Sequence, residues 1–393
     1  MSRSTRSWRV GAVVLSLALV ATACGKSKDN SSSGSNNGTP VSLAFVGPKT
    51  GDAASLGINI LDGAKLAVDQ ANAAQSKYKF TLKEFDTQGD PAQAPGQLAK
   101  YKDDASILGL IGPAFSGETK AVLPDLKNAG LVMISSSATN ADLPNVPPGG
   151  SDVFHRVLPD DAAQGAGIVK FIKAKYAGKS VYFIDDNQEY SKGLTDQVSM
   201  ALGTPKTAQN STQINKDDDL YSAAVNAAKA ANPDVIFYGG YYQAAGKLKK
   251  QLTDAGVKAV FMSGDGSLDP GFISGAGAGA EGAIISCPCN LATDSAAGAL
   301  GTMAKDYKKA FNADPGTYSS EAFDAANILI KGIEAGNDTR AKLLAYVEAI
   351  KSYDGVSKKI VFQPNGDLVA TTVYFFKVTN GKFVSAGDTD HLT

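Results

Sequence analysis

The chain is poor in the residues that most often carry out chemistry. It contains three cysteines and two histidines, His155 and His391, among 393 residues. Three cysteines are too few for a disulfide framework, and no G-x-S-x-G motif is present to carry a serine nucleophile. Because the sequence places no base beside a nucleophile, it argues against an enzyme.

A strong net charge and membrane-length apolar runs are also missing. The 38 Lys and Arg residues are balanced by 39 Asp and Glu residues, for a net charge of −1, so no basic field is available to attract nucleic acid. The uncharged apolar run at residues 10–23 is shorter than the roughly 20 residues that span a bilayer. Hydrophobic residues still make up 43% of the chain, which indicates a globular body.

The N-terminus has the order of a secretion signal. Arg3, Arg6 and Arg9 precede the uncharged run, and the small residues VATA lead directly to Cys24. This order predicts a signal peptide over residues 1–23 and resembles a bacterial lipobox, in which the cysteine is lipidated. An ordinary signal peptide followed by a chance cysteine is the alternative.

Residues 24–40 are small and polar almost throughout, which predicts a disordered tether. The two acyl chains of a lipidated Cys24 would hold the protein stably on a membrane. We therefore expect an extracytoplasmic protein that is anchored to the bacterial cell membrane.

The body alternates apolar strands with amphipathic helices. Ile60, Ala64 and Val68 share one helix face, and Phe323 and Ile330 share another within a helical region at 295–350. Continuous apolar strands between helices are typical of parallel sheets covered on both faces. The pattern predicts an α/β protein with two lobes, each a mostly parallel sheet flanked by helices, and a ligand cleft between them. The expected strands lie at 41–47, 79–86, 107–112, 131–135, 180–185, 235–240, 259–264 and 283–286.

Two motifs resemble a dinucleotide-binding site and a metal site, but their sequence context does not support either function. The segment GAGAEG at 277–282 matches a dinucleotide fingerprint, yet it precedes a strand instead of following one. Cys287 and Cys289 have no Cys or His near them in sequence, so we expect no metal site. In an oxidising compartment the two cysteines form either a local disulfide or two free thiols.

Hydroxyl, aromatic and acidic side chains follow several predicted strands. Ser116 stands at a predicted helix start, and Ser137 and Thr139 follow the next strand, facing the same way if the strand conformation persists. Simple helix capping is the alternative for these hydroxyls. Tyr190, Tyr241 and Asp265 follow strands of the second lobe, at the sheet edge where α/β proteins bind ligands. The alternative is an aromatic packed under a loop and an aspartate that caps a turn.

Several segments in order resemble the leucine/isoleucine/valine-binding proteins of bacterial ABC importers. The resemblance covers most of residues 41–380 and implies a type I periplasmic-binding-protein fold with a three-crossing hinge. The segments are VGPKTGDAASLG, IGPAFSGET, VMISSSATNADL, DDNQEYSKG, FYGGYYQAAGKLKKQLTDAG and FMSGDGSLDPGFI.

The resemblance also implies roles for individual residues. The ligand carboxylate would be held by Ser116, Ser137, Ala138 and Thr139, and the ammonium by Asp265 with Tyr241 beside it. Tyr190 and Tyr318 would wall the cleft. Ala114, Phe115 and Leu56 would complete the site. Two departures affect the expected side-chain preference: the family often has glutamate at the position of Asp265, and an aromatic is common at that of Leu56.

The expected lobes are 41–157 with 288–365, and 158–287 with 366–393, with crossings near 156–159, 286–290 and 363–369. The expected function is a lipid-anchored solute-binding protein without a cofactor, which delivers a branched-chain or other aliphatic amino acid to an ABC permease and its ATPase subunits. A binding or sensor protein of the same fold for an amide, urea or aromatic acid is one alternative. A secreted hydrolase is the other.

Overall fold

The computed structural model describes residues 38–147, 150 and 152–392. The predicted signal peptide, Cys24 and most of the predicted tether therefore lie outside the described residues. The tether is wrong at its last two residues, because the first strand, β1, already begins at Thr39, whose N–H donates to the Lys77 carbonyl at 2.8 Å. Within the described part of the chain, no helix combines the length and apolarity needed to cross a membrane.

The first sheet has five parallel strands in the order β2-β1-β3-β4-β5. Three of them, β1, β3 and β4, coincide with apolar runs in the sequence, because strands covered on both faces carry few polar residues. Their bounds are Thr39–Gly47 (β1), Tyr78–Asp86 (β2), Ile107–Ile111 (β3), Val132–Ser135 (β4) and Phe154–Arg156 (β5).

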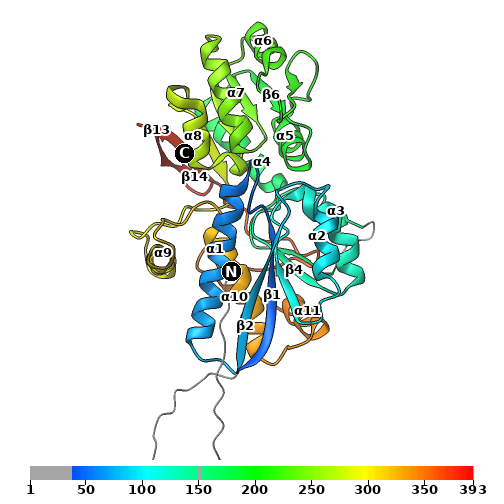
Figure 1. Cartoon of the computed structure of the whole chain (residues 1–393). Helices are drawn as coiled ribbons and strands as arrows, with labels where there is room; N and C mark the ends of the chain where they lie inside the picture. Colours follow the sequence, from blue (N-terminus) through cyan, green and yellow to red (C-terminus); the bar gives the residue numbers. More distant parts are fainter. Residues whose placement is uncertain (1–37, 148–149, 151, 393) are drawn as a thin grey trace, which may run out of the picture. The chain divides into compact units, whose positions relative to one another are not determined.

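Helices cover both faces of this sheet, and the alternation of side chains along β1 shows how. Leu43 and Phe45 join the apolar cluster that holds α1 and α10, whereas Ala44 and Val46 join the cluster under α2 and α3. Figure 1 shows α1 and α10 on one side of the sheet and α2 and α3 on the other. The helices are Ala54–Ala73 (α1), Ala94–Tyr101 (α2), Ser116–Asn128 (α3) and Ser319–Glu334 (α10), with a short 3-10 turn at Leu143–Asn145 (η1).

The second sheet has seven strands in the order β14-β13-β10-β9-β8-β6-β7. The five strands from β10 to β7 run parallel, and β13 and β14 add an antiparallel pair at the other edge. The bounds are Val181–Asp185 (β6), Ser211–Gln213 (β7), Val235–Tyr238 (β8), Val260–Ser263 (β9), Ile284–Cys287 (β10), Tyr374–Thr379 (β13) and Lys382–Asp388 (β14).

The second sheet is also covered on both faces. Phe183 and Phe237 pack in the cluster with α4 and α5, and Ile236 and Phe261 pack with α6, α7 and α8. The helices are Asp161–Lys175 (α4), Glu189–Leu202 (α5), Ser222–Ala231 (α6), Tyr242–Asp254 (α7) and Pro270–Ala276 (α8), with short 3-10 turns at Asp265–Ser267 (η2) and Gly277–Ala280 (η3). The expected α/β architecture of two sheets flanked by helices is confirmed.

The helical region expected at 295–350 forms three helices and returns to the first sheet. Helix α10 packs closely along α1, where a Cβ on Gly63 would lie 2.2 Å from the Ser319 carbonyl oxygen, so only glycine fits this contact. The remaining elements are Gly298–Phe311 (α9), Arg340–Glu348 (α11), and the short strand pair Tyr353–Asp354 (β11) and Lys359–Ile360 (β12).

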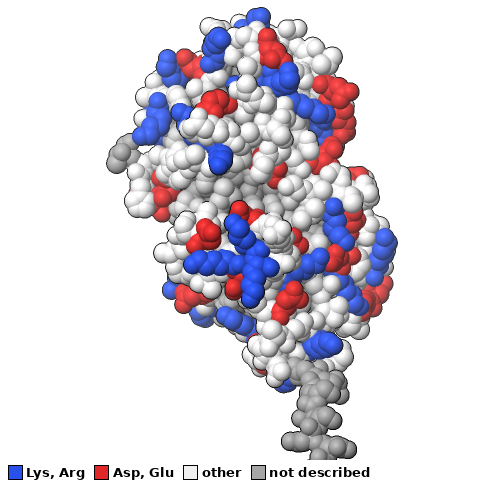
Figure 2. Space-filling model, turned by 60° about the vertical axis from the view of Figure 1, so that its left-hand side comes forward, with Lys and Arg blue, Asp and Glu red and all other residues white. Residues whose placement is uncertain are grey.

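The chain passes between the sheets three times. The passages follow β5, β10 and β12, over residues 157–160, 288–297 and 361–373. The crossings expected near 156–159, 286–290 and 363–369 lie within or overlap these segments. On the face shown in Figure 2, basic and acidic side chains are interspersed, in line with the near-zero net charge.

Candidate functional site

Helix α3 begins at Ser116, directly after β3, as the sequence predicts. The Ser116 hydroxyl does not cap its own helix but accepts from the Asn140 N–H at 3.1 Å, so its proton remains free to be donated. The preceding N–H, that of Phe115, donates to the buried Glu118 carboxylate at 2.8 Å. Glu118 also accepts from the Thr87 hydroxyl. The start of α3 therefore presents the Ser116 hydroxyl as a donor, next to a backbone N–H that Glu118 holds in place.

The loop after β4 holds the other predicted hydroxyls. Ser137 and Thr139 face the same way only if the strand conformation persists, and this condition is not met, because β4 ends at Ser135. The Ser137 hydroxyl donates to the Ala114 carbonyl, and the Ala138 N–H donates to the Ser135 hydroxyl at 3.0 Å. Thr139 is different: its buried hydroxyl makes no well-formed hydrogen bond among the described residues, but it lies near enough to the Asp161 carboxylate to oppose the rise that burial causes in the pKa of that group.

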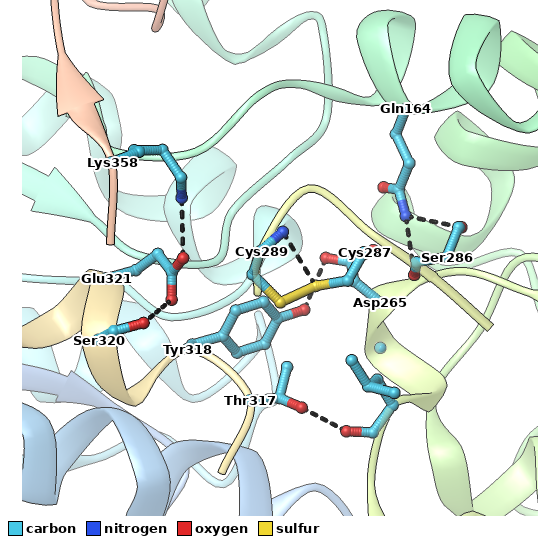
Figure 3. Close-up of a disulfide and its surroundings, with 12 residues drawn as sticks. Gln164, Asp265, Ser286, Cys287, Cys289, Thr317, Tyr318, Ser320, Glu321 and Lys358 are labelled. Atoms are coloured by element: carbon cyan, nitrogen blue, oxygen red, sulfur yellow. Dashed lines mark hydrogen bonds and ion pairs between the residues drawn. A yellow bond between two sulfur atoms is a disulfide. The ribbon is translucent and has the colours of Figure 1, made fainter. Parts of the chain in front are cut away.

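Asp265 follows β9 and is fully buried, at 0% exposure. Its carboxylate accepts from the hydroxyls of Tyr190 at 2.7 Å and Tyr318 at 2.6 Å. Burial raises the pKa of Asp265, and the two tyrosine hydrogen bonds oppose that rise. Figure 3 shows the Tyr318 ring pointing at the Asp265 carboxylate. The side chain thus binds tyrosines from two separate elements, which a simple turn cap would not do.

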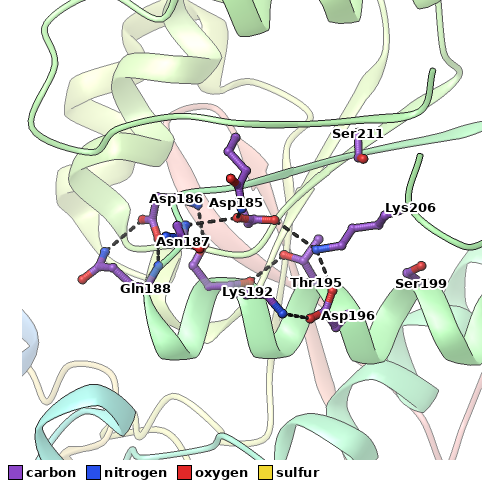
Figure 4. A network of polar contacts seen from close by, with 12 residues as sticks. Asp185, Asp186, Asn187, Gln188, Lys192, Thr195, Asp196, Ser199, Lys206 and Ser211 are labelled. Atoms are coloured by element: carbon purple, nitrogen blue, oxygen red, sulfur yellow. Dashed lines mark hydrogen bonds and ion pairs between the residues drawn. The ribbon is translucent and has the colours of Figure 1, made fainter. Parts of the chain in front are cut away.

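The tyrosines are held in place by the backbone and by polar contacts. Tyr318 has a positive φ of 72° just before α10, a conformation that is rare for a bulky residue and is enriched at functional sites. Tyr190 follows a loop tied down by a network in which Lys206 bridges Asp185 at 3.0 Å and Asp196 at 2.6 Å (Figure 4).

Aromatic rings join the two sides of the site. The Tyr241 ring, at the start of α7, lies 4.6 Å from Phe115 and 5.0 Å from Tyr190, centroid to centroid. Ala114 contributes the carbonyl that holds Ser137, and Leu56 is buried in the apolar cluster around α1. The structure therefore brings the first-sheet residues Phe115 and Ser116 up to the second-sheet residues Tyr241, Tyr190 and Asp265.

Two residues of this region are missing from the sequence-based site. Asp161 begins α4, and both of its carboxylate oxygens are buried without a hydrogen-bond partner among the described residues. Burial raises the pKa of Asp161 well above its usual range, and the nearby Asp265 charge raises it further. Gln164, one turn later, donates to the Ser286 hydroxyl at 3.1 Å. The paired acids in LPDDAAQG were a usable signal: Asp160 caps the helix by accepting from Ala163 N–H at 2.8 Å, which leaves Asp161 without that role.

Arg156 ties the Thr139 loop to the hinge. Its guanidinium is fully buried and donates to the Ala138 carbonyl at 3.1 Å and the Asn140 carbonyl at 2.9 Å, on either side of Thr139. The same group binds Asp367 in the third crossing, with Nε to Oδ1 at 2.8 Å. A buried charge needs such a partner, and here the pairing fixes the loop against a crossing segment.

The two remaining cysteines lie where β10 meets the second crossing: Cys287 ends the strand and Cys289 lies in the crossing. A disulfide joins Cys287 and Cys289 (Figure 3). Among the described residues, no group of three or more His, Cys, Asp or Glu side chains is arranged to hold a metal ion. The disulfide lies beside Ser286, which binds Gln164, so it borders the site from the hinge.

A cavity of about 460 Å³ opens on the other side of the aromatic pair. Of the predicted ligand residues, Phe115 and Tyr241 line it. Ser116, Thr139 and Asp265 are buried and lie outside that lining. The arrangement consists of neutral donors on the first-sheet side, carboxylates on the second-sheet side and aromatic rings toward the opening.

Two sheets of this order, joined by three crossings with a polar site at the strand ends, define the type I periplasmic-binding-protein architecture. The family model of the periplasmic binding protein matches residues 40–382, so the chain belongs to the periplasmic binding protein family. This is a family of extracytoplasmic binding proteins, not enzymes.

Individual relatives agree with the expected resemblance. The chain is 27% identical over 338 residues to the leucine-, isoleucine-, valine-, threonine- and alanine-binding protein of Pseudomonas aeruginosa, covering 84% of this chain and 87% of that protein. Solved structures show the same fold. A leucine-binding protein of Thermotoga maritima matches with a TM-score of 0.79 at 23% identity. The match covers 88% of this chain and 98% of the Thermotoga chain. The isoleucine complex of a branched-chain amino acid binding protein of Streptococcus pneumoniae also has a TM-score of 0.79, at 24% identity and 88% and 100% coverage.

Proposed function

We propose that this protein binds a free amino acid with a branched-chain or other aliphatic side chain and delivers it to an ABC import permease. The observation that carries the proposal is the buried carboxylate of Asp265, which accepts hydrogen bonds from the hydroxyls of Tyr190 at 2.7 Å and Tyr318 at 2.6 Å. An amino acid is a zwitterion that loses water from both charges when it is enclosed, so each charge needs partners of the opposite kind. The names of the relatives support the aliphatic class.

The two charged ends have separate receptors in this proposal. The hydroxyls of Ser116 and Thr139 and nearby backbone N–H groups hold the carboxylate, because several dipoles can converge on an anion. Asp265 holds the ammonium, and Asp161 is a second acid beside it. Thr139 and Asp161 lie close enough together for the Thr139 hydroxyl to oppose the rise that burial causes in the pKa of Asp161, and neither side chain makes a well-formed hydrogen bond among the described residues. Buried polar atoms are usually hydrogen-bonded, which supports a ligand-binding role for this pair.

The ligand is identified by mass spectrometry of small molecules released from the purified protein, followed by calorimetry with leucine, isoleucine, valine, acetamide, urea and benzoate. We expect an aliphatic amino acid in the extract and tight binding of at least one of the first three. If the protein bound acetamide, urea or benzoate and none of the three amino acids, it would be a binding protein of the same fold for a different class of ligand. Turnover of ester or amide substrates would instead establish a hydrolase.

Closure about the hinge accompanies binding in this proposal, because both sides of the cleft contribute ligand groups. Contacts between the two sides support it: the Asn140 side-chain amide donates to the Glu189 carbonyl at 2.9 Å, and Lys120 pairs with Glu189 at 2.7 Å. Small-angle scattering with and without the bound ligand tests closure. We expect a smaller radius of gyration in the complex, and an unchanged radius with a saturating ligand would contradict closure.

Membrane anchoring through Cys24 completes the proposal. The order of charged, apolar and small residues before Cys24 supports lipidation, which would keep the protein near its permease. Cys24→Ala should release the protein from the membrane or stop its processing. Membrane retention of a processed but unlipidated variant would rule out this anchor.

A further inference from the structure

The cavity of about 460 Å³ beyond the aromatic pair differs in chemistry from the buried site. Its walls come from strand-end loops of both sheets, which carry Asp52, Gln88 and Asp186, and from helix α7, which carries Lys247. Such a polar, solvent-connected space does not suit an apolar side chain. The boundary between the two regions therefore matters for which ligands fit.

Phe115 and Tyr241 form that boundary. Phe115 directly precedes Ser116, and Tyr241 packs against the backbone beside Asp265, where a Cβ on Gly266 would lie 3.0 Å from its ring. The two rings are 4.6 Å apart, and Phe115 is only 4% exposed. They lie between the cavity that they line and the buried receptors for both charges.

The chemistry of the surroundings also sets the direction of the ligand side chain. Toward the hinge the site offers Arg156, Gln164 and Asp161, which are charged or polar and buried. Toward the cavity it offers the faces of Phe115 and Tyr241, with Tyr190 behind them. An apolar side chain gains most by burial against the rings, so it points at this pair.

We propose that Phe115, together with Tyr241, is a size filter: the pair closes the buried site toward the cavity and sets the longest side chain that the site accepts. This inference rests on the proposed amino acid function. Removing the Phe115 ring joins the buried site to the cavity, so longer side chains then extend into it.

The first test compares wild type with Phe115→Ala by calorimetry over unbranched 2-amino acids from norvaline to 2-aminooctanoic acid. We expect wild-type affinity to fall at the longer members, and Phe115→Ala to improve the longest relative to norvaline by at least tenfold, about 1.4 kcal/mol. Phe115→Leu should fall between the two. Phe311→Ala is the matched control, because Phe311 makes a similar aromatic pair with Tyr307 at 4.8 Å on α9.

A constant ratio of the Phe115→Ala and wild-type affinities along the series would overturn the size filter, because a merely structural role lowers all affinities together. If wild type binds none of these amino acids and none of leucine, isoleucine and valine, the proposed function is contradicted instead. The size filter is then tested by the accessibility of the buried site. For this second test Ser116→Cys is made in a Cys24→Ser background and labelled with a small thiol reagent without ligand.

The filter predicts slow labelling of the cysteine at position 116 while Phe115 is present, and at least tenfold faster labelling once Phe115→Ala is added. Phe311→Ala should leave the rate unchanged. Equal labelling rates with and without the Phe115 ring would mean that access depends on opening of the whole cleft, and would overturn the proposal.

Discussion

The two sides of the cleft differ in the charge of the groups that they carry. On the first-sheet side, the hydroxyls of Ser116 and Thr139 are neutral. The buried Glu118 is turned to the backbone of its own helix start, and the buried Glu321 pairs with Lys358 at 2.8 Å. On the second-sheet side, Asp265 and Asp161 bring two carboxylates into the same buried region. An anion can be held by converging dipoles, whereas a buried cation is best met by a carboxylate. The comparison therefore predicts different penalties for substitutions on the two sides.

The largest effect is expected for Asp265→Asn, which keeps the shape and removes the charge. Losing one partner of a buried charge pair typically costs about 2–5 kcal/mol, or roughly 30-fold to several thousand-fold in affinity. Calorimetry on the folded variant measures this loss, with Asp254→Asn on the exposed end of α7 as the control. Affinity within about threefold of wild type would defeat the ammonium assignment.

A large effect on stability, but not on binding, is expected for Glu118→Gln. Burial raises the pKa of Glu118 to about 7 from an ordinary 4.5, so the folded state holds its proton more tightly than the unfolded state. The resulting stabilisation is complete below pH 4.5 and is lost as the pH rises through about 7.

Denaturant unfolding across this pH range should therefore show wild type losing up to roughly 3 kcal/mol relative to Glu118→Gln. Asp104→Asn is the control, because hydrogen bonds from Lys83 and Ser106 lower the pKa of Asp104 to about 2, outside the range. If Glu118→Gln weakened ligand binding without changing stability, the first-sheet side would also bind the ligand through a carboxylate. The proposed difference between the two sides of the cleft would then be wrong.

An intermediate effect is expected for Asp161→Asn. Asp161 makes no well-formed hydrogen bond among the described residues, although the nearby Thr139 hydroxyl opposes the rise that burial causes in its pKa, so the substitution mainly removes its ionisable group. If it shares the ammonium with Asp265, affinity should fall about tenfold, or about 1.4 kcal/mol. A bound ammonium group favours the ionised form of the Asp161 carboxyl, so ligand binding should release a proton from wild type. Calorimetry in buffers of different ionisation enthalpy should detect this release. Unchanged affinity and proton release in the variant would leave Asp265 as the single acid of the site.

The smallest effect is expected for Ser116→Ala on the first-sheet side. One neutral donor is worth on the order of 1 kcal/mol, or roughly fivefold in affinity. Ser274→Ala, which removes a local hydroxyl contact with the Gly271 carbonyl, should leave affinity unchanged. A loss at Ser116 as large as that at Asp265 would show that the two sides do not differ as the structure suggests.

Much of the fold could be predicted because buried parallel strands leave a strong local signal. The apolar runs around Leu43, Phe183 and Ile236 need no distant partner to be recognised as strands, and the polar residues that follow them mark the sheet edge. Prediction was weaker where the strand signal was short, as in the edge strands β5 (Phe154–Arg156) and β7 (Ser211–Gln213). The loop at Ser137 and Thr139 also departed from the extended conformation that its alternation favoured.

The sequence by itself determined the alternation of strands and helices, the balance of charge and the strand-end residues Ser116, Tyr190, Tyr241 and Asp265, because each depends on neighbours within a few positions. Only the tertiary structure decided which of these residues meet. The pairing of Arg156 with Asp367, the hydrogen bond from Tyr318 to Asp265 and the contact of Phe115 with Tyr241 join residues 211, 53 and more than 100 positions apart. Such contacts depend on how two sheets are joined by three crossings, and no local pattern of residues encodes that geometry.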